Sequence, residues 1–263
     1  WEALLKRSLD IGADYIATGH YARIERLANG RYAIRNSVTA RKDQTYALYN
    51  LTQDQLSRTL MPVGEYTKEE IRRIAGEAGL PVAQKKDSQE ICFVPDNDYA
   101  GFIEKSTGTK ISGGNYIKKD GTVIGEHKGI IHYTIGQRKG LNLSMGHPVF
   151  VTEIRPETNE VVIGENEELF VRSLICDRMN YMAMEEINEG EVLTGKIRYN
   201  HPGATFTLKK LEDGRVQVNF LEPQRAVTPG QAVVLYRGEY VAGGGIILGP
   251  VREKENAAAL SEF

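Results

Sequence analysis

Hydrophobic residues recur at two different spacings in this sequence, and the change comes after about residue 94. Before that point, stretches with helical spacing alternate with short strand-like runs. Leu5 and Leu9 lie on one face of a predicted helix that Gly12 ends, and the strand-like run 14–18 follows at once. Alternating helices and strands are typical of an α/β domain with a parallel sheet, so we predict one here.

Two later helices of this first part have start signals. Thr52 and Gln55 have the spacing of a capping box, in which each side chain accepts a hydrogen bond from the other residue's backbone N–H. Thr67 and Glu70 have the same spacing and open a helix that Gly79 ends. The opening helix and its strand indicate the second half of a β-α-β unit, and we expect the first strand of that unit to lie upstream of these residues.

The second part of the sequence is dominated by short strands. After one short predicted helix, 98–105, the glycine-rich stretch 113–140 holds a turn at 119–121 between two β runs. A hairpin is predicted next, from 149–154 to 161–163.

From residue 168 the pattern is nearly all strand. The predicted strands are residues 169–176, 191–199, 204–211, 216–220, 232–236 and 241–247. Six short strands separated by turns predict a small closed or partly closed antiparallel barrel. We therefore predict an α/β part (1–95), a central domain (96–167), a β-barrel (168–252) and a loose tail (253–263).

Composition narrows the class of protein. At 263 residues with 41% hydrophobic content, the chain can bury a core in each of two or three domains. No run approaches the length of about eighteen apolar residues that a membrane helix needs, so we predict no membrane span. The two cysteines form no Cys-x-x-Cys pair and no disulfide framework, which points to a reducing cytoplasm.

Charge is segregated along the chain. The formal net charge of −2 argues against a broadly basic nucleic-acid coat but allows local patches. Residues 127–152 hold three lysines and arginines, residues 192–211 hold four, and neither stretch has an acid. Ordinary solvated faces also carry such runs, so charge alone leaves an RNA-binding face and a solvated face both open.

Cys92 has the more reactive surroundings of the two cysteines. It opens the apolar run 91–94 just after the polar cluster 85–88, where two lysines favour the thiolate, the form in which a thiol does chemistry. Spacing alone favours a small buried hydrophobe at the start of a strand, because free cysteine is among the most buried residue types. Cys176 lies in an apolar strand-like run, and nothing in the sequence recruits it to catalysis.

Four stretches of the sequence, taken in order, resemble one enzyme family. They are Ala17-Thr18-Gly19-His20-Tyr21-Ala22-Arg23, Lys42-Asp43-Gln44-Thr45-Tyr46, Asp87-Ser88-x-x-Ile91-Cys92-Phe93 and His132-Tyr133-Thr134-Ile135-Gly136-Gln137-Arg138-Lys139-Gly140. They are similar to motifs of the tRNA-specific 2-thiouridylases, which replace the C2 oxygen of the wobble uridine with sulfur. The resemblance implies a Rossmann-like adenine-nucleotide alpha-hydrolase domain, a small mixed central domain and a C-terminal antiparallel β-barrel.

In that family an ATP-binding loop, Ser-Gly-Gly-Val-Asp-Ser, and a first catalytic cysteine, in Asn-Pro-x-x-x-Cys, precede the region that matches Trp1. Neither pattern occurs in these residues. We therefore expect the chain to be a C-terminal fragment of a sulfurtransferase and to be inactive by itself.

The resemblance also implies chemistry for single residues. Cys92 would carry a persulfide loaded by a sulfur-donor or relay protein, and ATP with Mg²⁺ would adenylate the C2 oxygen. Direct attack by the persulfide, and release of sulfide when the upstream cysteine closes a disulfide onto Cys92, both stay open. Gly19 follows a predicted strand, where open sheets bind ligands, and matches a glycine that contacts ATP. For His20 we favour packing over a base or metal-ligand role.

Two more segments match tRNA contacts of the family. Lys42, Asp43 and Gln44 match residues near the target base, where amide and carboxylate groups can read an extruded base and lysine can hold phosphate. Arg198-Tyr199 matches an Arg-Tyr pair that the family's barrel places on tRNA, so the anticodon stem-loop is the expected partner. Judged from the residues alone, the first segment is a solvated loop and the second a strand end.

Two other functions stay open. The barrel and a degenerate α/β remnant could form a non-catalytic RNA-binding protein, or the α/β part could belong to another adenylating ATP pyrophosphatase that acts on a small molecule. The coding sequence upstream of Trp1 separates these functions, because a phosphate loop and a cysteine there support the thiouridylase.

Overall fold

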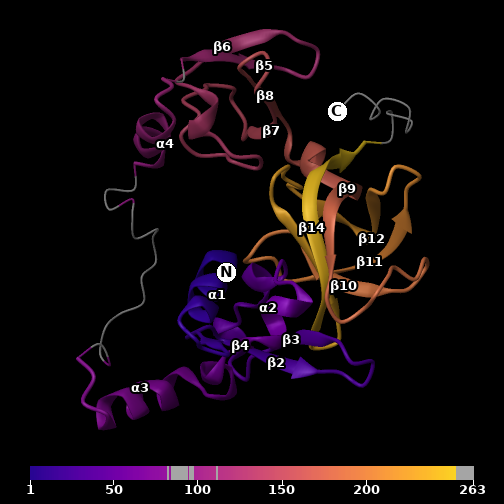
Figure 1. The fold of residues 1–263 in the computed structure, drawn as a ribbon. Helices are drawn as coiled ribbons and strands as arrows, with labels where there is room; N and C mark the ends of the chain where they lie inside the picture. The colour runs from indigo at the N-terminus through magenta and orange to yellow at the C-terminus, as the bar shows by residue number, and fades with distance from the viewer. Residues whose placement is uncertain (82, 84–93, 95–97, 111, 253–263) are drawn as a thin grey trace. The chain divides into compact units, whose positions relative to one another are not determined.

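The computed structural model describes residues 1–252 except 82, 84–93, 95–97 and 111. Within this part of the chain there are two compact units (Figure 1). The larger unit takes in the described residues of 1–85, 172–223 and 228–252, and the smaller unit takes in those of 86–171 and 224–227. The first and last thirds of the sequence therefore fold together.

The N-terminal part of the larger unit contains short helices and short strands. Its helices are α1 (Glu2–Asp10), α2 (Gln53–Ser57) and α3 (Lys68–Glu77), with the 3-10 helices η1 (Ala40–Lys42), η2 (Thr45–Leu48) and η3 (Pro62–Glu65). Its strands are β1 (Ile16–Ala17), β2 (Ala22–Arg26), β3 (Tyr32–Asn36) and β4 (Thr59–Leu60). β1 pairs in parallel with β4, which confirms an α/β remnant.

The helices begin and end where their sequence signals predict. Both capping boxes form: the Thr52 side chain accepts from the Gln55 N–H at the start of α2, and the Thr67 side chain accepts from the Glu70 N–H at the start of α3. Gly79 follows α3 with a φ of +69°, a left-handed conformation that favours glycine. No helix among the described residues is long and apolar enough to cross a bilayer.

One element of this region was not predicted. β2 and β3 form an antiparallel hairpin, and β3 continues the sheet of the barrel by pairing with the barrel's last strand, with Arg35 opposite Tyr240. The turn contains Asn29-Gly30, and Gly30 has a φ of +83°. An Asn-Gly pair between strand-like runs is a strong hairpin signal, so the information was present in the sequence.

The C-terminal part of the larger unit is a closed barrel. Its strands are β9 (Phe170–Tyr181), β10 (Leu193–Lys196), β11 (Ala204–Lys210), β12 (Val216–Arg225), β13 (Ala232–Arg237) and β14 (Tyr240–Val251). The order runs β13-β10-β11-β12-β9-β14, and an additional β13–β14 pairing closes the ring. The six-stranded antiparallel barrel predicted from the strand pattern is confirmed.

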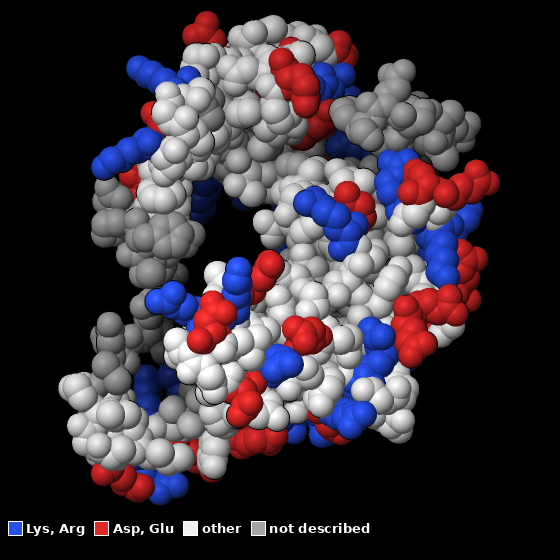
Figure 2. Space-filling model, in the orientation of Figure 1, with Lys and Arg blue, Asp and Glu red and all other residues white. Residues whose placement is uncertain are grey.

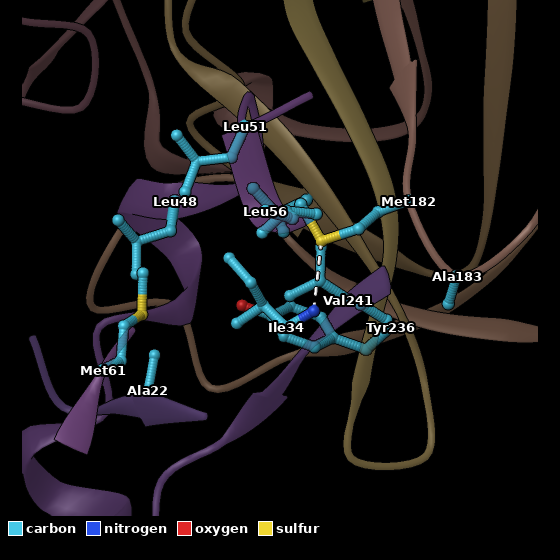
Figure 3. Packing of buried hydrophobic residues seen from close by; sticks show 12 residues of the cluster. Ala22, Ile34, Leu48, Leu51, Leu56, Met61, Met182, Ala183, Tyr236 and Val241 are labelled. Atoms are coloured by element: carbon cyan, nitrogen blue, oxygen red, sulfur yellow. Dashed lines mark hydrogen bonds between the residues drawn. The ribbon is translucent and has the colours of Figure 1, made fainter. Parts of the chain in front are cut away.

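The α/β remnant and the barrel share one hydrophobic core (Figure 3). Ile34 and Leu56 from the remnant pack with Met182, Tyr236 and Val241 from the barrel, and all five are at most 6% exposed. The Ile34 N–H also donates to the Met182 sulfur at 3.3 Å (Figure 3). Each such aliphatic side chain contributes about 1.5–3 kcal/mol when buried, so this core binds the two parts tightly. The separate boundaries 1–95 and 168–252 stay a prediction.

The smaller unit is built on a four-stranded mixed sheet. Its elements are α4 (Tyr99–Thr107), β5 (Gly114–Ile117), β6 (Val123–His127), η4 (Ile130–His132), β7 (Phe150–Arg155), β8 (Glu160–Gly164) and η5 (Asn166–Leu169). The order is β6-β5-β8-β7, with β5 and β8 parallel and the other pairs antiparallel. The predicted hairpin is β7–β8, and the predicted helix is α4, whose first turn is capped by the Asp98 side chain.

Candidate nucleic-acid interface

The fold brings together the two segments that match tRNA contacts. The Tyr199 hydroxyl donates to the Asp43 backbone carbonyl at 3.2 Å, although the two residues are 156 positions apart. The Tyr199 ring also meets the Tyr46 ring edge-on, with centroids 6.1 Å apart. Because 48% of Tyr199 is exposed, one face of this contact stays open to a ligand. The neighbours of the two contacting residues in the sequence are Lys42 and Gln44, on either side of Asp43, and Arg198, which precedes Tyr199.

The Asp43 carboxylate holds the loop that carries it, residues 37–46, hereafter the Asp43 loop. It accepts hydrogen bonds from the Ser37 N–H at 2.9 Å, the Thr45 N–H at 3.1 Å and the Thr45 hydroxyl at 2.5 Å. A carboxylate with three such donors shapes the backbone around it. Asp43 is therefore best suited to positioning the loop rather than to reading a base edge directly.

Gln44 is tied to the strand end at Tyr21. Its side-chain oxygen accepts from the Tyr21 N–H at 2.8 Å, and its own N–H donates to the Tyr21 carbonyl at 3.0 Å. The amide nitrogen of the Gln44 side chain takes part in no hydrogen bond with the described residues. One donor thus remains for a ligand, while the oxygen fixes the side chain.

Three residues outside the predicted set anchor the Asp43 loop to the barrel. The Thr45 hydroxyl lies 3.1 Å from the Tyr236 hydroxyl in the interior, and the Tyr46 hydroxyl donates to the Ala232 carbonyl at 2.9 Å. Burial raises the pKa of Tyr46 to about 12 and raises that of Tyr236 as well, so both phenols stay neutral at physiological pH. Thr45 and Tyr46 belong to the second family motif, whereas Tyr236 lies in a predicted barrel strand with no signal of this contact.

Gly19 lies just beyond the carboxyl end of β1, as predicted. The Thr18 N–H donates to the Leu60 carbonyl at 3.0 Å and fixes this strand end. Gly19 itself is exposed, its φ is not in the left-handed region, and an added Cβ would meet no atom within 4 Å. The fold does not require a glycine here, so the open space is compatible with the close approach of a nucleotide.

His20 packs beside this strand end. Its Nδ1 lies 3.0 Å from the Thr18 hydroxyl, and its ring meets that of Trp1 with centroids 5.4 Å apart. Burial lowers the pKa of His20, so the ring is neutral at physiological pH. These contacts are those of a packing residue.

The structure describes one of the two cysteines, Cys176. Cys92, the predicted persulfide carrier, lies outside the described residues. Cys176 is fully buried in β9, where its thiol donates to the Val216 carbonyl at 3.4 Å. Burial, with a smaller effect of the Asp177 carboxylate, raises the pKa of Cys176 to about 12. A thiol held in its neutral form is a poor nucleophile.

The fourth motif forms a turn in the smaller unit, residues 134–140, hereafter the Gln137 loop. The Gln137 side chain accepts from the Thr134 N–H and donates to the Lys139 carbonyl, both at 3.0 Å. The Gln137 carbonyl in turn accepts from the Val151 N–H at 2.9 Å. This turn exposes Arg138 and Lys139, two cations of the acid-free stretch 127–152.

Charge on the visible surface is mixed. Figure 2 shows lysine and arginine side chains next to aspartate and glutamate side chains over the face in view.

No group of three or more His, Cys, Asp and Glu side chains in the described residues could hold a metal ion.

Three domain models match consecutive stretches of the chain. They are the tRNA methyl transferase HUP domain (residues 1–96), the tRNA methyl transferase PRC-barrel domain (residues 100–165) and the aminomethyltransferase beta-barrel domain (residues 171–247). The match to a HUP domain agrees with the parallel β1–β4 pair, and the last match covers most of the closed barrel.

Curated relatives are more similar still. The tRNA-specific 2-thiouridylase MnmA of Lachnoclostridium phytofermentans is 64% identical over 248 residues, which cover 94% of this chain and 70% of that protein. The proteins of the same name from Clostridium botulinum and Clostridium kluyveri are 54% and 51% identical over 247 residues, or 94% of this chain and 68% and 69% of theirs. The resemblance carried by the four motifs is confirmed, and the chain belongs to the tRNA-specific 2-thiouridylase family, whose members are tRNA-modifying sulfurtransferases.

Proposed function

We propose that this chain takes part in the ATP-dependent replacement of the C2 oxygen of the wobble uridine of tRNA by sulfur. The observation that carries the proposal is the convergence of the Asp43 loop with Tyr199, since two segments matched to the same RNA meet in one place. The names of the relatives support the same reaction for those proteins.

Each converging side chain has chemistry suited to an extruded nucleotide. Lys42 and Arg198 supply cations for phosphate, the Tyr199 ring supplies a stacking surface, and the Gln44 amide supplies a donor for a base edge. Asp43 acts through the backbone, because its carboxylate fixes the loop on which Lys42 and Gln44 lie. The uridine must leave the anticodon stack to be modified, which explains why binding and chemistry use separate parts of the protein.

ATP, bound as its Mg²⁺ complex, would supply the adenylate leaving group at the C2 oxygen. Gly19 fits this role because it is exposed at the end of β1 with open space around it. The Mg²⁺ ligands are not assigned to this chain, because its described residues hold no cluster that fits a metal.

Cys92 would hold the sulfur as a persulfide, Cys–S–S⁻, loaded by a sulfur-donor protein. Attack of its terminal sulfur on C2 expels the leaving group, and a second cysteine thiolate then attacks the Cys92 sulfur, which frees the thiouridine and forms a disulfide. In the alternative route that thiolate attacks first and releases sulfide, which attacks C2. Both routes end in the same disulfide, and a cytoplasmic reductant would return it to two thiols.

The two cysteines provide the test. The full-length protein is incubated with ATP, a persulfide donor and unmodified tRNA, and 2-thiouridine is measured by mass spectrometry of the digested RNA. Cys92→Ser should abolish the product, whereas Cys176→Ser should retain most of it because its thiol is buried and protonated. Equal loss in both variants would contradict the assignment.

We further propose that the 263 residues alone give no product, because they contain no phosphate loop of the family type.

A further inference from the structure

A polar groove of about 770 Å³ lies in the larger unit beside the candidate interface. One wall is the Asp43 loop with the end of β3, and the other is β10 together with residues 202–205. Asp43 belongs to its lining, so the groove adjoins the contact between the Asp43 carbonyl and Tyr199.

Two threonines and a lysine supply the groove's available polar groups. Thr194 and Thr205 are direct partners in the β10–β11 ladder, both are exposed and both line the groove. Neither hydroxyl makes a hydrogen bond with any described residue. Lys196 lies two positions along β10, also lines the groove and forms no ion pair with the part of the chain that the structure describes.

The acidic side chains of the groove do not neutralise Lys196. The Asp43 carboxylate is engaged by donors of its own loop. The Glu239 carboxylate accepts two hydrogen bonds from Arg35, at 2.7 and 2.9 Å. Arg23 also lines the groove, where its Nε donates to the Asn36 carbonyl at 2.7 Å, and it pairs with the exposed Glu65 carboxylate, which is outside the lining, at 3.9 Å. The groove therefore presents positive charge and neutral hydroxyl donors.

We propose that this groove binds the sugar-phosphate backbone of the single-stranded RNA next to the target uridine. A lysine and exposed threonine hydroxyls are side chains that contact phosphate and the ribose 2′-hydroxyl, and the exposed Tyr199 ring beside them suits base stacking. Lys196, Thr194 and Thr205 lie outside the five residues matched to tRNA contacts, and they extend the interface along β10 and β11. The inference rests on the proposed function, because it takes the RNA substrate from it.

The test compares two lysines of the barrel in the full-length protein. Binding of an unmodified anticodon stem-loop RNA is measured over a range of salt concentrations. Lys196→Ala should lower the slope of log Kd against log salt by about 0.7, the value for one phosphate contact to a single strand. Lys209→Ala is the matched control, because Lys209 is an exposed lysine of β11 outside the groove, and it should leave the slope unchanged. A duplex without the loop should show no difference between the two variants.

A second pair of variants separates charge from folding. Thr194→Glu and Thr194→Gln have nearly the same shape, and only the glutamate places a negative charge in the groove. Thr194→Glu should weaken binding of the stem-loop more than Thr194→Gln does, and circular dichroism should be the same for both.

ATP also carries phosphates, so its affinity is measured in parallel and should be the same in all four variants. Equal slopes for Lys196→Ala and Lys209→Ala, or a change confined to ATP binding, would overturn the groove as an RNA site. If the unaltered protein binds the stem-loop and the Lys196→Ala variant binds it with the same salt slope, only this inference fails. If the unaltered protein does not bind RNA, the proposed function fails with it.

Discussion

The Asp43 loop and the Gln137 loop both carry family motifs, but they are stabilised in opposite ways. The Asp43 loop depends on distant parts of the chain: Tyr236 and Ala232 of the barrel hold its Thr45 and Tyr46 side chains. The Gln137 loop is held within the smaller unit: one of its own side chains bridges Thr134 and Lys139, strand β7 pairs with its backbone, and the Arg225 guanidinium donates to the Gly136 carbonyl at 3.4 Å.

The difference shows that two motifs of similar length can be stabilised by contacts at very different distances along the chain. A turn closed by its own glutamine loses little chain entropy when it forms. A loop anchored by residues almost 200 positions away keeps its shape only while the barrel is folded. We therefore expect substitutions in the two loops to have effects of different reach.

The largest effect is expected at Asp43. Asp43→Ala should lower the free energy of unfolding of the larger unit by about 3 kcal/mol, because two backbone N–H groups and a hydroxyl lose a charged acceptor. Urea denaturation followed by tyrosine fluorescence measures this. Lys42→Ala in the same loop should change stability by less than about 0.5 kcal/mol yet weaken tRNA binding. An Asp43→Ala variant as stable as the unaltered protein would show that the loop does not depend on this carboxylate.

The next largest effect concerns the contact between the loop and the barrel. Arg198→Ala should weaken tRNA binding by about 1–3 kcal/mol and lower the salt slope by about one unit. Tyr199→Ala should weaken binding with little change of slope, because stacking releases no ions. Tyr199→Phe keeps the ring and loses only the bond to the Asp43 carbonyl, so it separates stacking from loop support. If the arginine and tyrosine variants change the slope alike, the pair has no distinct roles.

A smaller and more local effect is expected at Gln137. Gln137→Ala should destabilise the smaller unit by about 1–2 kcal/mol, because the Thr134 N–H and the Lys139 carbonyl lose their partner. Hydrogen exchange followed by mass spectrometry should show faster exchange in the smaller unit and no change in the barrel. Faster exchange in the barrel would contradict the local character of this loop.

The smallest effect is a pH dependence confined to the smaller unit. The His127 Nδ1 accepts from the Gly129 N–H at 3.0 Å, which places the proton on Nε2, 3.1 Å from the Asn159 carbonyl. Burial lowers the pKa of His127 in the folded state. The unfolded chain therefore binds the proton more tightly, so the stabilising contribution of neutral His127 is full above about pH 6.5 and decreases as the pH falls below it.

Thermal unfolding between pH 7.5 and 5.5 tests this. His127→Gln keeps an amide donor and acceptor but does not titrate, so its melting temperature should fall less than that of the unaltered protein over this range. His20 has a lowered pKa too and remains in both proteins, so it cancels in the difference. Parallel pH profiles would show that His127 does not titrate in this range.

Local signals in the sequence predicted local structure well. The capping boxes at Thr52 and Thr67 and the turns between the barrel strands each lie within a few residues of the element they define. The pairing of Arg35 with Tyr240 has no such signal, because it joins two strands separated by most of the chain. The same is true of the groove, whose lysine and threonines look like ordinary strand residues until the Asp43 loop is placed opposite them.

For the site residues, too, the sequence carried no signal for features that depend on the folded backbone. The family resemblance indicated that Lys42, Asp43, Gln44, Arg198 and Tyr199 share a substrate, but it gave no sign that the Asp43 carboxylate points into its own loop. That feature depends on the positions of the Ser37 and Thr45 N–H groups, which only the folded backbone fixes. The roles of these five residues, of Gly19 and of Cys92 stay predictions that the variants above can decide.

The pairing of the β2–β3 hairpin with β14 sets an order of events during synthesis on the ribosome. The hairpin and the Asp43 loop are made early, whereas the strand that pairs with the hairpin, Tyr240–Val251, is synthesised much later. The nascent protein cannot complete its candidate RNA-binding surface until the last strand has emerged. Polypeptides that stop before residue 240 would therefore lack the strand that closes the barrel and holds the hairpin beside it.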